Sequence, residues 1–567
     1  LLGATLALSV TPVTAEYNHQ EAIAAPYQYK PAPAPAAGAT GTDYYFPGKD
    51  IGALEEGSIP NSCFFKAWYA GSYMAHSDKV IQGSGNNPDS WVGYWPAKFK
   101  LPVGSTLILK GRYPNARYQS VDTYAGPIPV DAIASFQIEP DEGSTNPMKV
   151  GSDRTVDNRE WTLKMVPGLK PAKPAKNTLY LQPENVKDPK DLIAELRYRV
   201  YFPDRGRDVL GDVPLPWLHE LQLADGTVVK GEENICAKVN MNLSMGAMTE
   251  TSFDTRIWKN LVKLAPNPAR APAQDTPNWE RMFTIPYSIL GQFLLPDGKA
   301  KRAEIPLPKP TKGGGGGLTG TQANSYVFTY LSHETPEREV AVTKLKVANT
   351  PKTFMGGKTT EVSGGPIQAQ YWSFCSNVDL AGLPIDGKDR SVPSGTRQST
   401  CHNDETVVLN KDRFTRIVVT PADKRPKNAT NACGWSWMAA GEPDLLGRPI
   451  TTLVLRPGLN GEEGFTQNSS NILKPGTEAE VMGDYMPKTE YMSVEDFEAL
   501  GCNKDGFEQQ DGHPDLPSVL WGTNQNLKPH LSPYVIPTGQ PVPETFKDIL
   551  MFLKNAAADS AKESMGQ

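Results

Sequence analysis

Short alternations of apolar and polar side chains run through most of the chain, and the clearest lies at residues 195–202. There three apolar side chains alternate with three more polar ones: Leu196, Tyr198 and Val200 with Arg197, Arg199 and Tyr201. A period of two predicts a β-strand with one face in a core, so the strand is expected to be half buried. Pro203 and the charges around Gly206 predict a turn directly after it.

Similar strand patterns form two groups, in which Gly, Pro, Asn and Asp separate the strands at short intervals. The first group comprises residues 106–110, 118–124, 133–138, 161–166, 178–181, 195–202 and 220–223. The second comprises residues 326–331, 340–347, 371–374, 407–409, 414–420, 435–438 and 451–455. This spacing is typical of sandwiches and jelly rolls. The expected fold class is mainly β, with two tandem jelly-roll-like β-sandwich domains.

The two groups share a short internal repeat. The sequence ARYQS at 116–120 is matched by AQYWS at 369–373, and each copy follows a strand that contains Leu-Lys. Because the order of the predicted elements also agrees, we interpret the two groups as related domains.

Helical patterns lie between the groups and at the end of the chain. Thr251 or Ser252 is a candidate cap for a helix with one apolar face, made of Phe253, Ile257, Trp258, Leu261 and Leu264. The apolar segment 278–295 contains Pro286 and is expected to be kinked or split. Near the C-terminus a short helix is expected from Ser493 to Gly501, followed by an amphipathic stripe of Phe546, Ile549, Leu550 and Leu553. This stripe is expected to dock on the protein's own core, or else on a partner or a lipid surface.

These patterns divide the chain into six parts. They are a signal-peptide remnant (1–15), a Pro/Ala-rich linker or arm (16–43), the first sandwich (44–230), a helical connector with a Gly-rich loop (231–317), the second sandwich (318–490) and a C-terminal extension (491–567). The five glycines at 313–317 lack the Lys and Ser/Thr that a phosphate-binding loop requires, so they are interpreted as a flexible loop.

Composition and charge limit which cellular compartments and which partners are expected. The chain of 567 residues has 50 glycines, 51 prolines and a formal net charge of −6, without a run of basic residues. Nucleic acid is therefore not an expected partner. No segment approaches the roughly 18 consecutive apolar residues of a membrane span. The apolar start, with small residues Val13 and Ala15, resembles an export signal cleaved after Ala15, so an extracellular, cell-surface or periplasmic location is expected.

Six cysteines fit such a compartment and permit three disulfides. The expected pairs are Cys375 with Cys401, Cys433 with Cys502, and Cys63 with Cys236. The alternative is that some of them are buried free thiols.

Candidate chemistry is sparse, because HExxH, GxSxG and CxxC motifs are missing from the sequence, and no cofactor is expected. The corner Asp204, Arg205, Arg207 and Asp208 is either a turn whose charges pair with each other or a rim that binds an anionic or hydroxylated ligand. His402, Asp404 and Glu405 form the densest set of metal-ligand types. Adjacent strand residues point to opposite faces, so a common metal site there requires a bulge.

Several segments resemble a known group of proteins. YPNARYQSVDTY, IEPDEGSTNP, RYRVYFPDRGRD and VPLP in the first group, and YWSFCSN, CHNDETVV and GWSWM in the second, resemble a group of uncharacterised exported bacterial proteins. They resemble more loosely the jelly-roll domains of a large bacterial family of unknown function. The resemblance covers about half of the chain and implies no particular reaction.

Two functions are expected from these observations. The first is a secreted, non-catalytic protein that binds a glycan, an apolar molecule or another protein, or assembles with itself through the N-terminal arm or the C-terminal helix. The alternative is an extracytoplasmic hydrolase or lyase that acts on a polymer such as a polysaccharide, with Asp204 or Asp208 in acid–base roles.

Overall fold

The structure is a computed structural model of the whole chain. It describes residues 63–65, 69–70, 89, 91–125, 128–184, 191–204, 207, 210–239, 255–283, 285–293, 324–354, 356, 361–362, 366–377, 397–398, 400–440, 446, 448–458, 465–509, 520–521, 536 and 539–564. The predicted signal remnant, the N-terminal arm and the glycine run lie outside the described residues.

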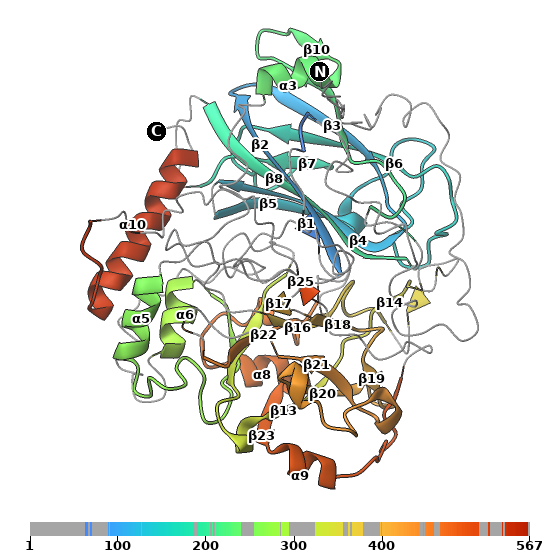
Figure 1. Cartoon of the computed structure of the whole chain (residues 1–567). Helices are drawn as coiled ribbons and strands as arrows, with labels where there is room; N and C mark the ends of the chain where they lie inside the picture. Colours follow the sequence, from blue (N-terminus) through green and yellow to red (C-terminus); the bar gives the residue numbers. More distant parts are fainter. Residues whose placement is uncertain are drawn as a thin grey trace, which may run out of the picture.

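The described chain is mainly β, and residues 69–230, here called the first half, form two sheets (Figure 1). One sheet has the spatial order β1 (Tyr69–Ala70), β2 (Val92–Pro102), β8 (Asp191–Pro203), β4 (Ala116–Ala125) and β5 (Ile128–Ala134). The other has the order β10 (Val228–Lys230), β9 (Trp217–Gln222), β3 (Thr106–Arg112), β6 (Glu160–Val166) and β7 (Thr178–Tyr180).

Alternate side chains of the two sheets meet in one apolar cluster. Leu196, Tyr198 and Val200 of β8 pack there with Leu109 of β3 and Trp161 of β6. The sequence therefore predicted the core face of β8 correctly. The expectation of a half-buried strand was wrong, because the side chains on the other face of β8 are buried as well.

Residues 280–492, here called the second half, also form two main sheets. One has the order β11 (Glu280–Arg281), β12 (Val327–Ser332), β22 (Ile450–Arg456), β16 (Ser373–Asn377) and β18 (Thr400–Asn403). The other has the order β21 (Ser436–Ala439), β20 (Phe414–Thr420), β13 (Val340–Lys346) and β23 (Lys488–Met492). Phe374 of β16, Leu455 of β22 and Ile417 of β20 lie in the shared apolar cluster.

The two halves have the same strand order. The order β1-β2-β8-β4-β5 corresponds to β11-β12-β22-β16-β18, and β9-β3-β6-β7 corresponds to β23-β13-β20-β21. Neighbouring strands in these sheets are antiparallel in both halves except at one place, where β6 pairs with β7 and β20 pairs with β21 in parallel. The repeat detected in the sequence falls at corresponding places, on β4 and immediately before and into β16.

Residue register agrees with this correspondence. Ser120 of β4 lies opposite Arg199 of β8, and Ser373 of β16 lies opposite Arg456 of β22. The guanidinium of Arg199 lies 5.7 Å from the ring centroid of Tyr94, and that of Arg456 lies 5.2 Å from the ring centroid of Tyr326. Ser373 and Arg456 therefore repeat the placement of Ser120 and Arg199.

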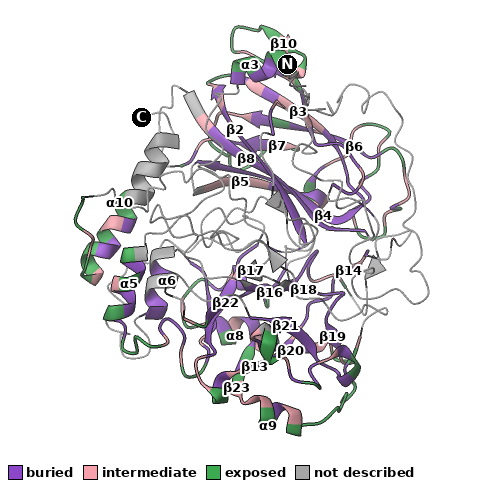
Figure 2. Ribbon diagram, in the orientation of Figure 1, coloured by how far each residue is buried: buried purple, intermediate pink, exposed green. Residues whose placement is uncertain are grey.

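The sheet with β8 and β4 faces the sheet with β22 and β16, and these strands are buried (Figure 2). Tyr201 of β8 lies between Tyr118 of the first half and Tyr371 of the second, with ring centroids 5.1 and 5.4 Å away. The Trp91 indole nitrogen donates to the carbonyl oxygen of Cys401 (2.8 Å). Aromatic and polar side chains thus join the two halves directly.

Helices lie mainly at the edges of the sheets. They are α3 (Glu232–Val239), α5 (Thr255–Leu264), α6 (Ile285–Phe293), α8 (Glu478–Met482), α9 (Val494–Ala499) and α10 (Phe546–Ser564). Helix α10 lies beside α5 and α6 (Figure 1), and Ile549, Leu550 and Leu553 are buried in the core of the second half. The predicted docking of this stripe on the protein's own core is confirmed. None of the helices in the described part of the chain is long and apolar enough to span a membrane.

The expected connector helix and split segment appear with small differences. Helix α5 begins at Thr255, while the candidate caps Thr251 and Ser252, and Phe253, lie outside the described residues. Leu264, expected on the buried face, is 39% exposed at the last turn. The segment around Pro286 divides into β11 and α6, and the proline lies in the first turn of the helix, where its missing N–H costs nothing.

Short pairs and single turns complete the described structure. The pairs are β14 (Pro351–Lys352) with β15 (Glu361–Val362), β17 (Arg397–Gln398) with β25 (Leu520–Trp521), and β19 (Val408–Leu409) with β24 (Glu508–Gln509). The 3-10 turns are η3 (Ser135–Gln137), η4 (Pro336–Arg338), η5 (Ala422–Lys424), η6 (Asn431–Cys433), η7 (Ser469–Asn471) and η8 (Gly483–Tyr485).

Candidate functional site

A set of buried polar side chains lies on the strands where the two halves face each other. This inter-half layer consists of Asp89, Arg117, Tyr118, Ser120, Asp122, Tyr124, Glu195, Arg197, Arg199, Tyr371, Ser373, Asp404, Glu405 and Arg456, all of them buried. Strand geometry explains it, because alternate residues of β8 and β4 point away from the apolar core and toward the other half.

On the side of the layer formed by the second half, the polar side chains gather around Asp89, which belongs to the first half. The Tyr371 hydroxyl donates to its two carboxylate oxygens (3.1 and 3.0 Å), and the Ser373 hydroxyl donates to Oδ2 (2.5 Å). The backbone N–H of Trp91 donates to Oδ1 (3.0 Å), and a guanidinium nitrogen of Arg456 lies 3.9 Å from Oδ2. A carboxylate from one half is thus held by three side chains of the other.

The corresponding side chains of the first half hold a different carboxylate. The Ser120 hydroxyl donates to Oδ2 of Asp122 (2.7 Å), and Arg199 Nη1 lies 2.5 Å from the same oxygen. Arg199 Nη2 also donates to the Tyr124 hydroxyl (2.6 Å). Asp122 lies two residues after Ser120 on β4, so this carboxylate comes from the same strand rather than from the other half.

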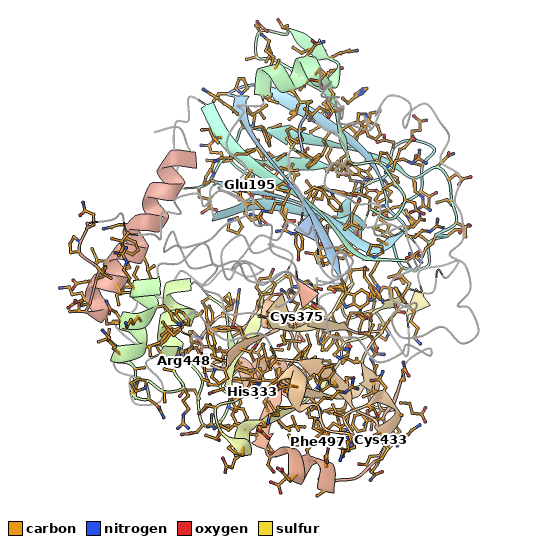
Figure 3. All side chains as sticks on the ribbon, viewed as in Figure 1. Glu195, His333, Cys375, Cys433, Arg448 and Phe497 are labelled. Atoms are coloured by element: carbon orange, nitrogen blue, oxygen red, sulfur yellow. A yellow bond between two sulfur atoms is a disulfide. The ribbon has the colours of Figure 1, made fainter. Side chains whose placement is uncertain are left out.

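A second ion pair lies further along β8, on the face that carries Arg199. Arg197 Nε donates to Oε1 of Glu195 (2.6 Å), and the Arg197 guanidinium lies 5.3 Å from the ring centroid of Tyr124. Asp122 lies opposite Arg197, and Tyr124 lies opposite Glu195. The face therefore presents two arginines and two carboxylates around tyrosine rings. Glu195 is labelled in Figure 3.

Burial keeps the tyrosines of this layer protonated. It raises the pKa of Tyr371 well above its usual value, and the nearby Asp89 carboxylate raises it further. Burial likewise raises the pKa of Tyr118, to which Asp122 contributes and which Arg199 opposes. Both phenols are therefore hydrogen-bond donors at physiological pH.

At the predicted metal site of His402, Asp404 and Glu405, the two carboxylates bind an arginine. Arg117 Nη1 donates to Asp404 Oδ2 (2.7 Å), and Arg117 Nη2 donates to Glu405 Oε1. The two carboxylates converge because they lie in a turn after β18, where Asn403 Oδ1 accepts from the backbone N–H groups of Glu405 (2.9 Å) and Thr406 (3.1 Å). A turn after β18, rather than a bulge, brings the two carboxylates together, and the Arg117 guanidinium binds both.

His402 belongs to a different set of contacts. Its Nε2 donates to the carbonyl oxygen of Trp437 (3.0 Å), and its Nδ1 lies 3.4 Å from the Thr406 hydroxyl. It therefore does not join the two carboxylates in binding one ion.

The pKa values around Arg117 follow from its burial and its two partners. Burial alone acts to lower the pKa of Arg117, but Asp404 and Glu405 outweigh it and raise the pKa. Burial raises the pKa of Glu405 above its usual value, while Arg117 opposes that rise.

In the corner after β8, the charged residues that the structure describes are paired. Arg154 donates to Asp204 Oδ1 (2.5 Å), and Arg207 Nη1 donates to Asp212 Oδ2 (2.6 Å). Asp204 and Arg207 are buried, which agrees with the alternative of internally paired turn charges, and the ligand-binding rim stays a prediction. Arg205 and Asp208 lie outside the described residues.

Three disulfides join the expected pairs: Cys63 with Cys236, Cys375 with Cys401, and Cys433 with Cys502. Cys375 and Cys433 are labelled in Figure 3. Among the described residues, two groups bring Cys and carboxylate atoms within reach of one ion, Cys63–Glu232–Cys236 and Asp89–Cys375–Cys401. Their sulfurs are in disulfides, so they are not the thiolates that bind metals.

The two tryptophans of the GWSWM segment have structural roles. Trp435 and Trp437 are buried, with the guanidinium groups of Arg416 and Arg425 lying 4.1 and 4.3 Å from their ring centroids. They belong to an apolar cluster with Phe497 and do not form an exposed platform for a sugar ring.

Sequence reasoning missed Asp89 and only partly detected its partners. The repeat ARYQS/AQYWS contains Tyr118, Ser120, Tyr371 and Ser373, and this was the available signal. Asp89 lies in no recognisable pattern, and its partners are more than 280 residues away in the sequence, so no local signal could identify it.

Comparisons with known proteins give little further information. No family model matches the chain, and no curated protein matches it. The solved structure of the VPA0106 protein from Vibrio parahaemolyticus aligns with 74% of this chain and 95% of its own, at 12% identity and a TM-score of 0.28. A similarity at that score supports no statement about fold or function.

Proposed function

We propose that this chain is an exported, non-catalytic binding protein that consists of two related jelly-roll-like sandwiches and binds a hydroxylated ligand such as a glycan. The proposed binding surface is the face of β8 and β4 in the inter-half layer. The matching strand order of the two halves supports a duplicated architecture, and the disulfides are typical of proteins outside the cytoplasm.

The observation that carries the proposal is the chemistry of one sheet face. Arg197 and Arg199 of β8 are paired with Glu195 and Asp122, and the Tyr124 ring lies beside both guanidinium groups. Tyrosine rings stack on sugar rings, and charged pairs donate to and accept from hydroxyl groups. The charges make an apolar ligand a poor fit, because its binding would leave these groups without hydrogen-bond partners.

One observation favours cleavage of a polymer as a second candidate. Glu195 and Asp122 point from the same face of adjacent strands and are diagonal neighbours, since Asp122 lies opposite Arg197. The backbones of diagonal neighbours are about 7–8 Å apart, so their carboxyl groups can reach the separations that glycoside hydrolases use. Each carboxylate is already paired with an arginine, so cleavage is the second candidate rather than the first.

The test is affinity electrophoresis of the full-length protein in gels that contain soluble polysaccharides. We expect retardation by at least one polysaccharide. The double variant Glu195→Gln/Arg197→Gln should bind about tenfold more weakly, because it loses charge-assisted hydrogen bonds. The matched control, Arg112→Gln/Glu160→Gln, removes an ion pair from the other sheet of the same half and should bind normally.

Two results would contradict the proposal. If no polysaccharide retards the wild-type protein, the glycan ligand is wrong. If the bound polysaccharide instead gains reducing ends, and Glu195→Gln or Asp122→Asn abolishes that gain, the second candidate replaces the first.

A further inference from the structure

Strand β23 lies at the end of a sheet that has one more strand in the other half. The order β9-β3-β6-β7 corresponds to β23-β13-β20-β21, but the first-half sheet continues beyond β9 to β10. Among the described residues, the second-half sheet ends at β23, whose ladder partner is β13. The N–H and C=O groups along the outer edge of β23 therefore face no described strand, and such an edge can pair with another chain.

The first half shows how the corresponding edge is completed. Strand β10 pairs antiparallel with β9, and Lys230 of β10 lies opposite Glu220 of β9. The ammonium nitrogen of Lys230 is 3.6 Å from Oε2 of Glu220. The added strand thus contributes backbone pairing and an ion pair between directly opposite residues.

Strand β23 contains both charges of such a pair. Lys488 and Glu490 are exposed and lie two residues apart, so they share one face of the strand. Thr489 between them faces the core, where its hydroxyl accepts from Trp279 Nε1 (2.9 Å). Lys488 also lies directly opposite Lys344 of β13, which is exposed as well. Because like charges directly opposite each other are destabilising, a carboxylate beside Lys488 would stabilise this edge.

We propose that β23 is a dimerisation surface, which pairs antiparallel with β23 of a second copy of this chain about a two-fold axis at Thr489. In this register Lys488 of each copy lies opposite Glu490 of the other, and the two sheets become continuous. The second copy then does for the second half what β10 does for the first. A lone lysine on an edge strand prevents pairing, but a lysine and a glutamate two residues apart make the edge complementary to itself.

Charge selects this register over its neighbours. A two-fold axis that keeps the exposed faces of both copies on the same side of the sheet must pass through a residue. An axis at Glu490 would place two glutamates opposite each other, and an axis at Lys488 would do the same with two lysines. The axis at Thr489 instead forms two equivalent ion pairs.

The other described element packed against β23 leaves the Lys488 end of the strand open. The turn η4 packs against β23, and the guanidinium of Arg338 lies 4.5 Å from the ring centroid of Tyr491. Because η4 directly precedes Val340, which lies opposite Met492, the turn is at the Met492 end. The paired stretch is short, so we expect a weak dimer with a dissociation constant of about 100 µM.

Sedimentation equilibrium of the full-length protein tests the proposal through charge reversal. Glu490→Lys and Lys488→Glu each place like charges opposite each other and should weaken dimerisation about tenfold. The double variant Lys488→Glu/Glu490→Lys restores opposite charges and should dimerise within about threefold of the wild type. The control Lys164→Glu changes a lysine on the exposed face of β6 and should have no effect.

Cysteine cross-linking tests the register. When the Lys488→Cys and Glu490→Cys variants are mixed and oxidised, a disulfide should join one variant to the other, and neither variant should cross-link with itself. A wild-type protein that stays monomeric up to about 1 mM, ten times the expected dissociation constant, would overturn the inference. Failure of the double variant to restore dimerisation, or cross-links between identical positions, would also overturn it. These outcomes are independent of polysaccharide binding, so the proposed function is tested separately.

Discussion

Arg117 is a buried arginine whose hydrogen-bond partners come from the other half of the chain. Its guanidinium bonds Asp404, Glu405 and the Thr353 hydroxyl (2.9 Å from Nε), and it lies 5.0 Å from the ring centroid of Phe202. Removing only the arginine would leave two carboxylates without a counter-charge in the interior.

We therefore expect Arg117→Gln to lower the free energy of unfolding by about 3–5 kcal/mol. Arg270→Gln is a suitable comparison, because its partner Asp275 is largely exposed, and it should cost no more than about 1 kcal/mol. Urea unfolding at neutral pH measures both values. Similar losses for the two variants would show that the Arg117 ion pairs contribute no more than surface ones.

His333 provides a pH-dependent contribution to stability. Its side chain is buried, and its Nδ1 donates to the carbonyl oxygen of Arg338 (2.9 Å). Burial lowers the pKa of His333 from 6.5 to about 4. The neutral form is therefore the one that the folded protein accommodates.

Because the unfolded chain binds the proton first, stability should fall as the pH decreases from 6.5 to about 4, by about 3 kcal/mol in total. Above about pH 7.5 the histidine is neutral in both states and contributes no slope. Denaturant titrations of wild type and His333→Gln at several pH values measure this contribution as the difference between the two curves. A difference that stays constant from pH 7 to pH 4 would contradict the assignment.

At the residue scale, the sequence could predict the chemical type of a side chain but not the residue with which it pairs. Asp404 and Glu405 were recognised as neighbouring ligands that need a bulge to converge, and a turn after β18 brings them together instead. Arg117 was not recognised as their partner, because pairing between strands so far apart in sequence depends on how the two halves meet.

The short helix α9 shows how much one capping residue can matter to an element. Ser493 accepts a hydrogen bond from the backbone N–H of Asp496 (3.0 Å), as the sequence predicted. The helix places Phe497 in a buried cluster, 4.9 Å from the ring centroid of Trp435. Figure 3 labels Phe497 at the lower edge of the molecule.

We expect Ser493→Ala to lower the free energy of unfolding by about 1 kcal/mol, because one N–H group at the start of the helix loses its acceptor. Ser493→Asp retains an acceptor and should stay near the wild-type value. Thermal unfolding of the three proteins distinguishes these outcomes. If the alanine and aspartate variants are equally destabilised, the side-chain cap is not the cause.

At the element scale, alternation identified β8 and its core face but missed β2, its longest neighbour. Pro96 interrupts the pattern of β2, and a proline argues against a strand. The structure tolerates it because β1 pairs only with Tyr94 and Gly93, so Pro96 lies on an edge of the described sheet. Alternation also says which side chains share a face and not what covers it, so the burial of the polar face could not be predicted.

Across the whole molecule, the inter-half layer should make the two halves unfold together. Asp89 comes from the first half and is held by three side chains of the second. Its removal would leave Arg456 without that carboxylate in a buried site, which weakens the contact between the halves more than the core of either.

We expect Asp89→Ala to lower the thermal midpoint and to split or broaden a transition that is single in the wild type. Scanning calorimetry tests this through the ratio of calorimetric to van't Hoff enthalpy, which should rise above one. The exposed Asp423→Ala serves as the control and should leave both quantities unchanged. A lower midpoint with an unchanged ratio would mean that other contacts still couple the halves.

The sequence suggested two related halves from five residues and a shared order of elements, and the strand order agrees with that interpretation. It could not show how the halves face each other, because that arrangement depends on contacts such as Trp91 with Cys401, which lie 310 positions apart.

The shared strand order has a practical consequence for experiments. Where β4 and β8 align with the shorter β16 and β22, a substitution has a counterpart in the same molecule, tested under identical expression and folding conditions. A saturation screen could therefore be scored as differences between counterparts. Positions that tolerate the same replacements in both halves would be those constrained by the fold. Positions whose tolerance differs would be those constrained by a function that only one half performs.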